Sequence, residues 1–289
     1  MTTTSPTATV SAVDAPTQFA ESNGRRLAYR SLGNGEPIIL CNRFRGILDT
    51  WDPAFLDGLA RSFNVITFDY SGLGRSTGHA SYDPRSLAKD AIDLADALGL
   101  DTIIAGGWSL GGLAAQTLVA LHPDRVSHAV LIGTGPPGAV AHPAEQIFYD
   151  TALKPVNDLA DETILFFEPL SESSRKAARQ SHDRIAARTR DLSVPIPPEV
   201  YTRLLTENAG PEIFPDRSRV RDFLSSTTMP VLVISGDHDI VFPIENWFAL
   251  VRSLPTTQVI SLPRAGHGPQ HQFPAAVVDY ITTFIRTTK

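Results

Sequence analysis

A serine set between glycines is the first group in this chain that could do chemistry. Residues 107–111 read Gly-Trp-Ser-Leu-Gly, after an apolar run and before a stretch of small helix-forming residues. Where a strand turns sharply into a helix, the serine hydroxyl stands exposed, and side chains at the flanking positions would collide. Ser109 is therefore the predicted nucleophile of an acyl transfer.

The same Gly-x-Ser-x-Gly pattern occurs a second time, around Ser76. A polar, glycine-bearing stretch separates this serine from the strand-like run 65–68, and no helix starts after it. Without a strand before and a helix after, the pattern has no elbow context. Ser76 is predicted to have no catalytic part.

A serine nucleophile needs a base, and the base needs an acceptor that orients it. The apolar run 231–235 leads into a loop that carries Asp237 and Asp239, and either aspartate could be the acid. His267 lies between glycines, which let an imidazole reach across a crevice. His271 and His238 are the alternative bases.

These groups need a sheet to position them, and the chain alternates short β-branched runs with runs of helical period. This pattern is typical of an α/β fold with a mostly parallel sheet covered on both faces. A helix is predicted over 84–98, and the final helix should bury Val277, Ile281 and Phe284 or Ile285. Eight strands are predicted at 18–22, 26–31, 37–41, 64–68, 102–106, 127–132, 230–235 and 258–262.

A long insertion separates the last two of these strands from the rest. No convincing strand lies between 132 and 230, so we predict a helical cap over 139–226, a core formed by 17–138 and 227–289, and a flexible tail over 1–16. The longest helical candidate in the cap is 171–191. Its basic side chains are expected to point mostly outward: Arg175, Lys176, Arg179, Arg184, Arg188 and Arg190.

In its motifs and their order the chain resembles the α/β-hydrolase-fold serine hydrolases, of the esterase or lactonase type with a helical cap. Residues 236–239 match the Gly-x-x-Asp pattern of that family, which selects Asp239 as the acid, and Gly266-His267 matches the setting of its base. Residues 69–76 resemble the Asp-x-x-Gly-x-Gly-x-Ser segment. The resemblance implies an α/β-hydrolase fold with an eight-stranded sheet and a triad of Ser109, Asp239 and His267.

The resemblance also implies an oxyanion hole made of two backbone amides. Leu110, directly after the nucleophile, supplies one. Family members usually carry His-Gly-x in the loop for the other, but this chain has Asn42 and Arg43 there. The second donor then falls on Phe44, with Arg43 as the alternative.

Two arginines, Arg43 and Arg45, lie beside the expected oxyanion position and suggest a site for a substrate anion. Our expectation is more modest: at least one should pair with a nearby carboxylate such as Asp49 or Asp69.

The substrate is expected to be a small-molecule ester or lactone, including an acyl-homoserine lactone or a macrolide, bound between the sheet and the cap. Residues expected to line that site are Arg43, Phe44, Trp108, Phe148 and Tyr149, with Phe166 and Phe167 as further cap aromatics. A receptor with slow or no turnover on the same fold, or a hydrolase of carbon–carbon bonds, is the alternative.

Composition excludes several other classes. The 289 residues carry a net charge of −6, which disfavours nucleic-acid and anionic-membrane partners. Cys41 is the sole cysteine, so neither an internal disulfide nor a thiolate zinc cluster is expected, and no metal or organic cofactor is implied. With neither a secretory signal pattern nor a long apolar stretch, the protein is expected to be cytoplasmic.

Overall fold

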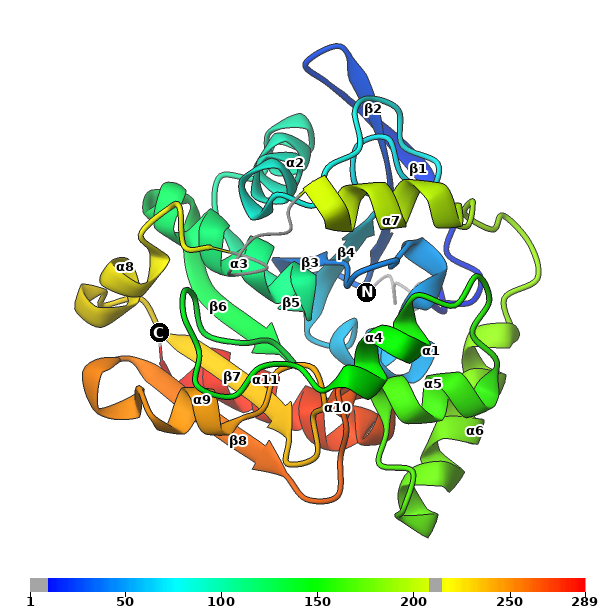
Figure 1. Cartoon of the computed structure of the whole chain (residues 1–289). Helices are drawn as coiled ribbons and strands as arrows, with labels where there is room; N and C mark the ends of the chain where they lie inside the picture. Colours follow the sequence, from blue (N-terminus) through cyan, green and yellow to red (C-terminus); the bar gives the residue numbers. More distant parts are fainter. Residues whose placement is uncertain (1–9, 208–214, 289) are drawn as a thin grey trace, which may run out of the picture.

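One sheet organises the chain. Within residues 10–207 and 215–288, which the computed structural model describes, eight strands pair in the order β1-β2-β4-β3-β5-β6-β7-β8 (Figure 1). The pairs β1/β2 and β2/β4 are antiparallel, and the remaining pairs are parallel. The predicted eight-stranded, mostly parallel sheet is confirmed, with strand ends shifted by one or two residues. The strands are β1 (Gln18–Ser22), β2 (Arg25–Leu32), β3 (Glu36–Cys41), β4 (Phe63–Phe68), β5 (Ile103–Trp108), β6 (Val126–Ile132), β7 (Val231–Gly236) and β8 (Thr257–Leu262).

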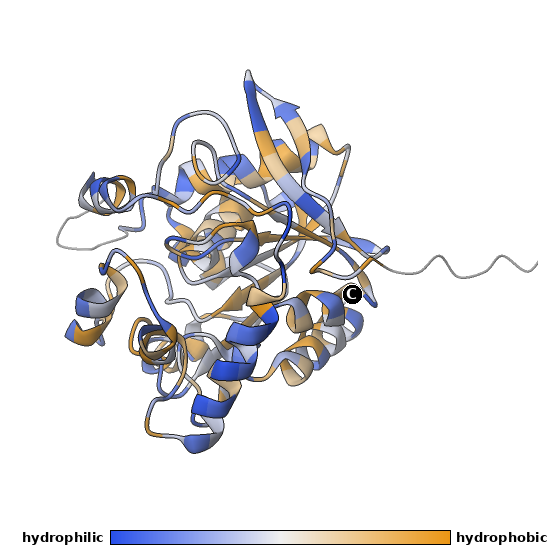
Figure 2. Cartoon of the chain, turned by 90° about the vertical axis from the view of Figure 1, so that its right-hand side faces the viewer, coloured by the Kyte–Doolittle hydropathy of each residue, from blue (hydrophilic) through white to orange (hydrophobic). Residues whose placement is uncertain are grey.

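The central strands are apolar on both faces because each face packs against helices. Successive side chains of a strand point to opposite sides, so neighbours in sequence enter different cores. Ile38 packs on the side of α1 (Pro53–Leu59) and α11 (Pro274–Thr287), whereas Ile39 packs on the side of α2 (Pro84–Ala97) and α3 (Leu110–Leu121). Figure 2 shows hydrophobic strands at the centre and hydrophilic residues on the outer helices.

Local signals explain where the flanking helices begin and end. In α2 the side chain of Asp83 accepts a hydrogen bond from the amide of Arg85, and a proline occupies the first turn. Gly99 follows the helix with a positive φ of 65°. Helix α11 buries Val277, Ile281, Phe284 and Ile285, as its apolar spacing predicts.

The segment between β6 and β7 is helical in its described part. Its helices are α4 (Gln146–Ala152), α5 (Leu159–Phe166), α6 (Glu172–Ala186), α7 (Pro198–Glu207) and α8 (Val220–Ser226). The remaining helices are α9 (Glu245–Phe248) and α10 (Pro269–Gln272), and short 3₁₀ turns occur at Leu48–Thr50, Pro123–Arg125 and Val251–Ser253. The 139–226 boundary of the cap stays a prediction.

Two of the six basic side chains of 171–191 that were expected to point mostly outward turn inward instead. The helix also ends earlier than predicted. Helix α6 ends at Ala186. Four of the six cations expected to point outward are exposed: Arg175, Lys176 and Arg179 in the helix, and Arg190 after it. Arg184 instead forms a bidentate pair with Asp52, at 2.8 and 2.6 Å. Arg188 is buried. Both turn inward because buried carboxylates and carbonyl oxygens in the core are their partners.

Arg188 anchors the N-terminal segment, which corrects the prediction of a flexible tail for residues 10–16. Its Nη1 donates to the carbonyl oxygen of Val13 at 2.9 Å, and its Nη2 donates to that of Ala15 at 2.8 Å. Ala15 is fully buried. The earlier residues of the predicted tail, 1–9, lie outside the described residues. A segment held by buried charge-assisted hydrogen bonds is part of the core.

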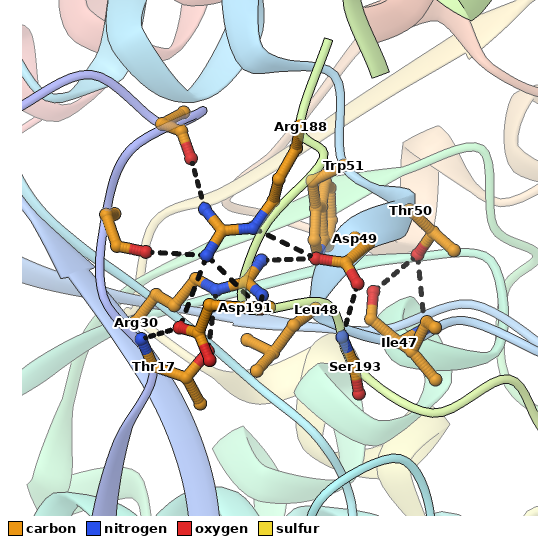
Figure 3. A network of polar contacts seen from close by, with 12 residues as sticks. Thr17, Arg30, Ile47, Leu48, Asp49, Thr50, Trp51, Arg188, Asp191 and Ser193 are labelled. Atoms are coloured by element: carbon orange, nitrogen blue, oxygen red, sulfur yellow. Dashed lines mark hydrogen bonds and ion pairs between the residues drawn. The ribbon is translucent and has the colours of Figure 1, made fainter. Parts of the chain in front are cut away.

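The same arginine belongs to a polar network that ties the end of the α6 segment to the sheet (Figure 3). Asp49 accepts hydrogen bonds from Arg30 Nη1 at 2.6 Å and from the amide of Ser193 at 2.5 Å. Asp191 accepts from the amide of Thr17 at 2.6 Å. The network therefore holds the segment that follows α6 against β2 and the N-terminal segment.

Candidate active site

The residues expected to act together follow strands whose carboxyl ends lie on one edge of the sheet. Phe44 comes after β3, Ser109 after β5, Asp239 after β7 and His267 after β8. Because these strands are parallel, their following loops meet over the same crevice, which is where ligands bind in open α/β sheets.

Ser109 stands on a strained turn between β5 and α3. Its φ of 61° and ψ of −122° are conformations that a non-glycine residue rarely adopts, at a cost of about 1–3 kcal/mol. A Cβ at Gly107 would overlap the carbonyl oxygen of Gly111, and one at Gly111 would overlap that of Cys41. The crowding explains both glycines of the motif, and the turn presents the hydroxyl beyond the sheet edge.

Asp239 and His267 form a buried pair. His267 Nδ1 lies 2.9 Å from Asp239 Oδ2, and neither side chain exposes more than 5% of its surface. The other carboxylate oxygen of Asp239 accepts from the amides of Val241 and Phe242, at 2.8 and 2.9 Å. The carboxylate is thus held by its own loop, and it can fix the orientation of the imidazole.

The alternative acid and bases lie in other settings. Asp237 is exposed and contacts His238 Nδ1 at 2.6 Å, a hydrogen bond that raises the pKa of this histidine. His271 is buried against the ring of Trp108, where its Nδ1 lies 3.3 Å from the hydroxyl of Ser181. The structure therefore brings Asp239, and not Asp237, to His267.

Ser109 and His267 face a common hollow. Both line a space of about 20 Å³ together with Phe44 and Arg43. Among the described residues, the Ser109 hydroxyl has no hydrogen-bond partner. Serine–histidine contacts of unliganded sites are often long and close only when substrate binds.

Two backbone amides next to Ser109 are available to an oxyanion. Leu110 is the first residue of α3, so its amide lacks an intrahelical acceptor, and the amide of Phe44 donates to no described residue. Both residues also line the larger cavity beside Ser109. This arrangement agrees with the predicted choice of Phe44, and the assignment stays a prediction.

Asn42, which replaces the family's histidine, is a structural residue that the sequence did not reveal. Its Nδ2 donates to the carbonyl oxygen of Phe68 at 2.6 Å, and its Oδ1 accepts from Trp51 Nε1 at 2.6 Å. The hydroxyl of Tyr70 donates to its backbone oxygen at 3.0 Å. These contacts fix the start of the loop that carries Phe44. The partners are too distant in sequence to give a signal.

The expectation that Arg43 or Arg45 pairs with Asp49 or Asp69 is wrong. Asp49 binds Arg30, and Asp69 accepts from the amides of Leu48 and Arg75 and from the Ser193 hydroxyl. The local carboxylates are already taken by residues that tie loops together. Arg45 instead reaches the carbonyl oxygens of Ala152 and Lys154, at 2.7 and 2.8 Å.

An apolar cavity of about 500 Å³ opens beside Ser109. It is walled by the elbow, the loop after β6, the loop after β7, and helices α4 and α7. Phe148 and Tyr149 lie in this wall, and their contact with substrate stays a prediction. Asn246 and His142, which sequence reasoning missed, brace this wall: the amide of His142 donates to Asn246 Oδ1 at 3.0 Å. These partners are 104 positions apart, so no local pattern marks them.

The prediction that Trp108 lines the substrate cavity is wrong. Trp108 is 1% exposed and packs on the α1 and α11 side of the sheet, because it is the last residue of a strand with both faces covered. Its Nε1 donates to the carbonyl oxygen of His267 at 2.7 Å. Phe166 stacks on the His267 ring, whereas Phe167 is buried in the helical segment. Trp108 therefore positions the histidine loop.

Two further candidate groups, Ser76 and Cys41, have no part in the crevice. Ser76 is buried, donating to the carbonyl oxygen of Asp69 at 2.7 Å and accepting from the amide of Ala28 at 2.9 Å. Burial raises the pKa of Cys41 to about 12, which leaves an unreactive thiol.

No cluster of three or more metal-ligating side chains occurs among the described residues. None of the described helices has the length and apolar character to span a bilayer.

The comparisons with known proteins agree with this architecture. The family described as alpha/beta hydrolase fold matches residues 36–274. A pimeloyl-[acyl-carrier protein] methyl ester esterase of Vibrio parahaemolyticus is 28% identical over 265 residues, which cover 88% of this chain and 97% of that protein. A solved alpha/beta hydrolase fold protein from Chitinophaga pinensis matches with a TM-score of 0.80 at 26% identity, covering 96% of this chain and all of that one (100%). An esterase from Rhodococcus sp. ECU1013 matches with a TM-score of 0.74 at 23% identity, over 94% and 99% of the two chains.

Proposed function

The chain belongs to the alpha/beta hydrolase fold family, and from this premise we propose that it is a serine hydrolase that cleaves a carboxylic ester or lactone of a small molecule. The observation that carries the proposal is the buried contact of 2.9 Å between His267 Nδ1 and Asp239 Oδ2, at the same sheet edge as the strained turn of Ser109. The esterase names among the relatives support the same class.

In the proposed mechanism, His267 removes the proton of the Ser109 hydroxyl as its oxygen attacks the substrate carbonyl. Asp239 stabilises the imidazolium that forms. The amides of Phe44 and Leu110 donate to the negatively charged oxygen of the tetrahedral intermediate, where one such donor contributes roughly 10²–10³ in rate. His267 then protonates the leaving alcohol, and water releases the acid from Ser109.

The cavity defines the kind of molecule that fits. Phe44, Leu113, Phe148 and Phe242 contribute apolar surface to its wall, so an apolar acyl group is the expected occupant. We also propose that residues 139–226 act as a cap, because α4 and α7 supply part of this wall. Acyl-homoserine lactones and macrolides are lactones with large apolar parts and belong in a substrate panel.

A fluorophosphonate probe tests the nucleophile directly, because it reacts with an activated serine. We expect the wild-type protein to be labelled and the Ser109→Ala variant to stay unlabelled. Ser76→Ala is the matched control and should be labelled like wild type. Absence of wild-type labelling would contradict the mechanism.

Substrate class is tested on short esters, long esters, homoserine lactones and macrolides, each followed by the mass of the product. Cleavage of a member of this panel that is lost in Ser109→Ala supports the proposal. Labelling without turnover of any member would instead favour a ligand-binding protein on the same fold.

A further inference from the structure

Arg43 carries a positive charge beside Ser109 and forms no ion pair among the described residues. Among the described residues it makes one hydrogen bond, from Nη1 to the carbonyl oxygen of Phe44 at 2.7 Å. Its Nε is buried and has no partner. Its guanidinium lies over the rings of Phe166 and Trp108, 4.6 and 5.3 Å from their centroids. A guanidinium has five donors, so most of its hydrogen-bonding capacity is unused.

Other partly or fully buried arginines of this protein show what a structural role looks like. Arg45, two positions along the same loop, donates to four acceptors in the segment 152–157. Arg30 pairs with Asp49, and Arg184 pairs with Asp52. Arg43 is partly buried and lacks such partners, although leaving a desolvated charge unpaired is costly.

The charge of Glu162 acts on Arg43, but its carboxylate makes no direct pair with the guanidinium. Burial lowers the pKa of Arg43 to about 10, and the charge of Glu162 opposes this shift. The guanidinium therefore stays protonated at neutral pH. The carboxylate of Glu162 contacts His182 Nδ1 at 2.8 Å and is not hydrogen-bonded to Arg43.

The position of Arg43 places it near the alcohol part of a bound ester. Arg43, Ser109 and His267 line the hollow of about 20 Å³, which has room for one small polar group. His267 must protonate the leaving oxygen, so the alcohol part of an ester has to lie along the wall that His267 forms. The adjoining cavity of about 500 Å³, which shares Ser109 and Phe44 with the hollow, is apolar and suits the acyl part.

We propose that Arg43 binds a carboxylate on the alcohol part of the substrate, so that the preferred substrate is the ester of an apolar acid with a short hydroxy acid. This inference rests on the proposed function. Arginine binds carboxylates through paired hydrogen bonds, and the rings that hold the guanidinium restrict its motion before substrate arrives. The bound anion would replace the acidic partner that the fold does not provide.

The test compares two esters of equal size. Octanoyloxyacetate carries a carboxylate on its alcohol part, and isobutyl octanoate has an isopropyl group in its place. We expect wild-type protein to cleave octanoyloxyacetate with the higher kcat/KM. In Arg43→Met, the ratio of the two kcat/KM values should fall roughly 10–100-fold, the range expected for charge-assisted hydrogen bonds.

Two further variants serve as controls for a general loss of structure. Arg43→Lys keeps the charge and should retain part of the preference, whereas Arg175→Met removes an exposed arginine outside the hollow and should leave the ratio unchanged. Equal losses on both esters in Arg43→Met, or no preference in wild type, would overturn the inference. If the preference is absent but isobutyl octanoate is cleaved and Ser109 is labelled, the proposed function still holds. If Ser109 is unlabelled and neither ester is cleaved, the proposed function itself fails.

Discussion

Acidification should destabilise this protein through one buried histidine, His271. Burial lowers the pKa of His271 to about 4 from its usual 6.5, and the charges of Arg43 and Arg184 act in the same direction, while Asp52 opposes them. The ring packs 4.6 Å from that of Trp108, and its Nε2 is buried without a partner. A proton added to this ring would therefore be poorly accommodated.

The size of the effect follows from linkage. The unfolded chain binds the proton near pH 6.5 and the folded chain only near pH 4, so between these values the unfolded state holds more protons. The contribution of His271 to the free energy of unfolding is therefore fully present above pH 6.5, and it is lost as the pH falls toward 4. At about 1.4 kcal/mol per unit, the 2.5 units correspond to a loss of about 3 kcal/mol, of which about 2 kcal/mol is lost by pH 5.

The assay is urea unfolding followed by tryptophan fluorescence at pH 7.5, 6.5, 5.5 and 5.0. His271→Gln replaces the ring by an uncharged amide that can still reach the Ser181 hydroxyl. It should cost stability at neutral pH but lose about 2 kcal/mol less than wild type on going to pH 5. His79→Gln, which changes an exposed histidine, should follow the wild-type curve.

Parallel curves for wild type and His271→Gln would refute the reasoning. They would mean that the folded protein accepts the proton on His271 as readily as the unfolded chain does.

Three other changes test the site and its supports. Asp239→Asn should lower kcat roughly 10³–10⁴-fold with little change in stability, because the imidazole loses the acceptor that orients it; a similar loss in Asp237→Asn would contradict the choice of acid. Asn42→Leu leaves the Phe68 carbonyl and the Trp51 indole unpaired, so its free energy of unfolding should fall by about 2–4 kcal/mol in urea, and an unchanged value would rule out the anchoring role. Arg188→Met should speed proteolysis and hydrogen exchange within residues 10–16, with Arg190→Met, an exposed cation, as the unaffected control.

Much of the fold could be predicted because its signals are local. Strands buried on both faces appear as short apolar runs, and the Asp83, Pro84 and Gly99 signals mark the ends of α2. The elbow is also local, since the crowding that requires Gly107 and Gly111 acts within one turn and against the adjacent β3. Resemblance to a known family then placed Asp239 and His267 after their strands.

The errors concern side chains whose partners are distant in sequence. Trp108 was expected in the cavity, but its indole donates to a carbonyl 159 positions away. Arg188 was expected on a solvated helix face, yet besides the nearby Asp191 its acceptors include the carbonyl oxygens of a segment 173 or more positions earlier. A pattern within one segment carries no information about such partners.

The sequence by itself determined the strand and helix pattern, the elbow and the order of the candidate serine, acid and histidine, because each depends on residues close along the chain. The family resemblance selected Asp239 as the acid; only the tertiary structure decided that Asp239 contacts His267, and that the loop carboxylates are already bound to other residues. The second result leaves Arg43 unpaired beside Ser109. Charge pairing is settled by distances of a few ångströms between segments far apart in sequence, and folding alone sets those distances.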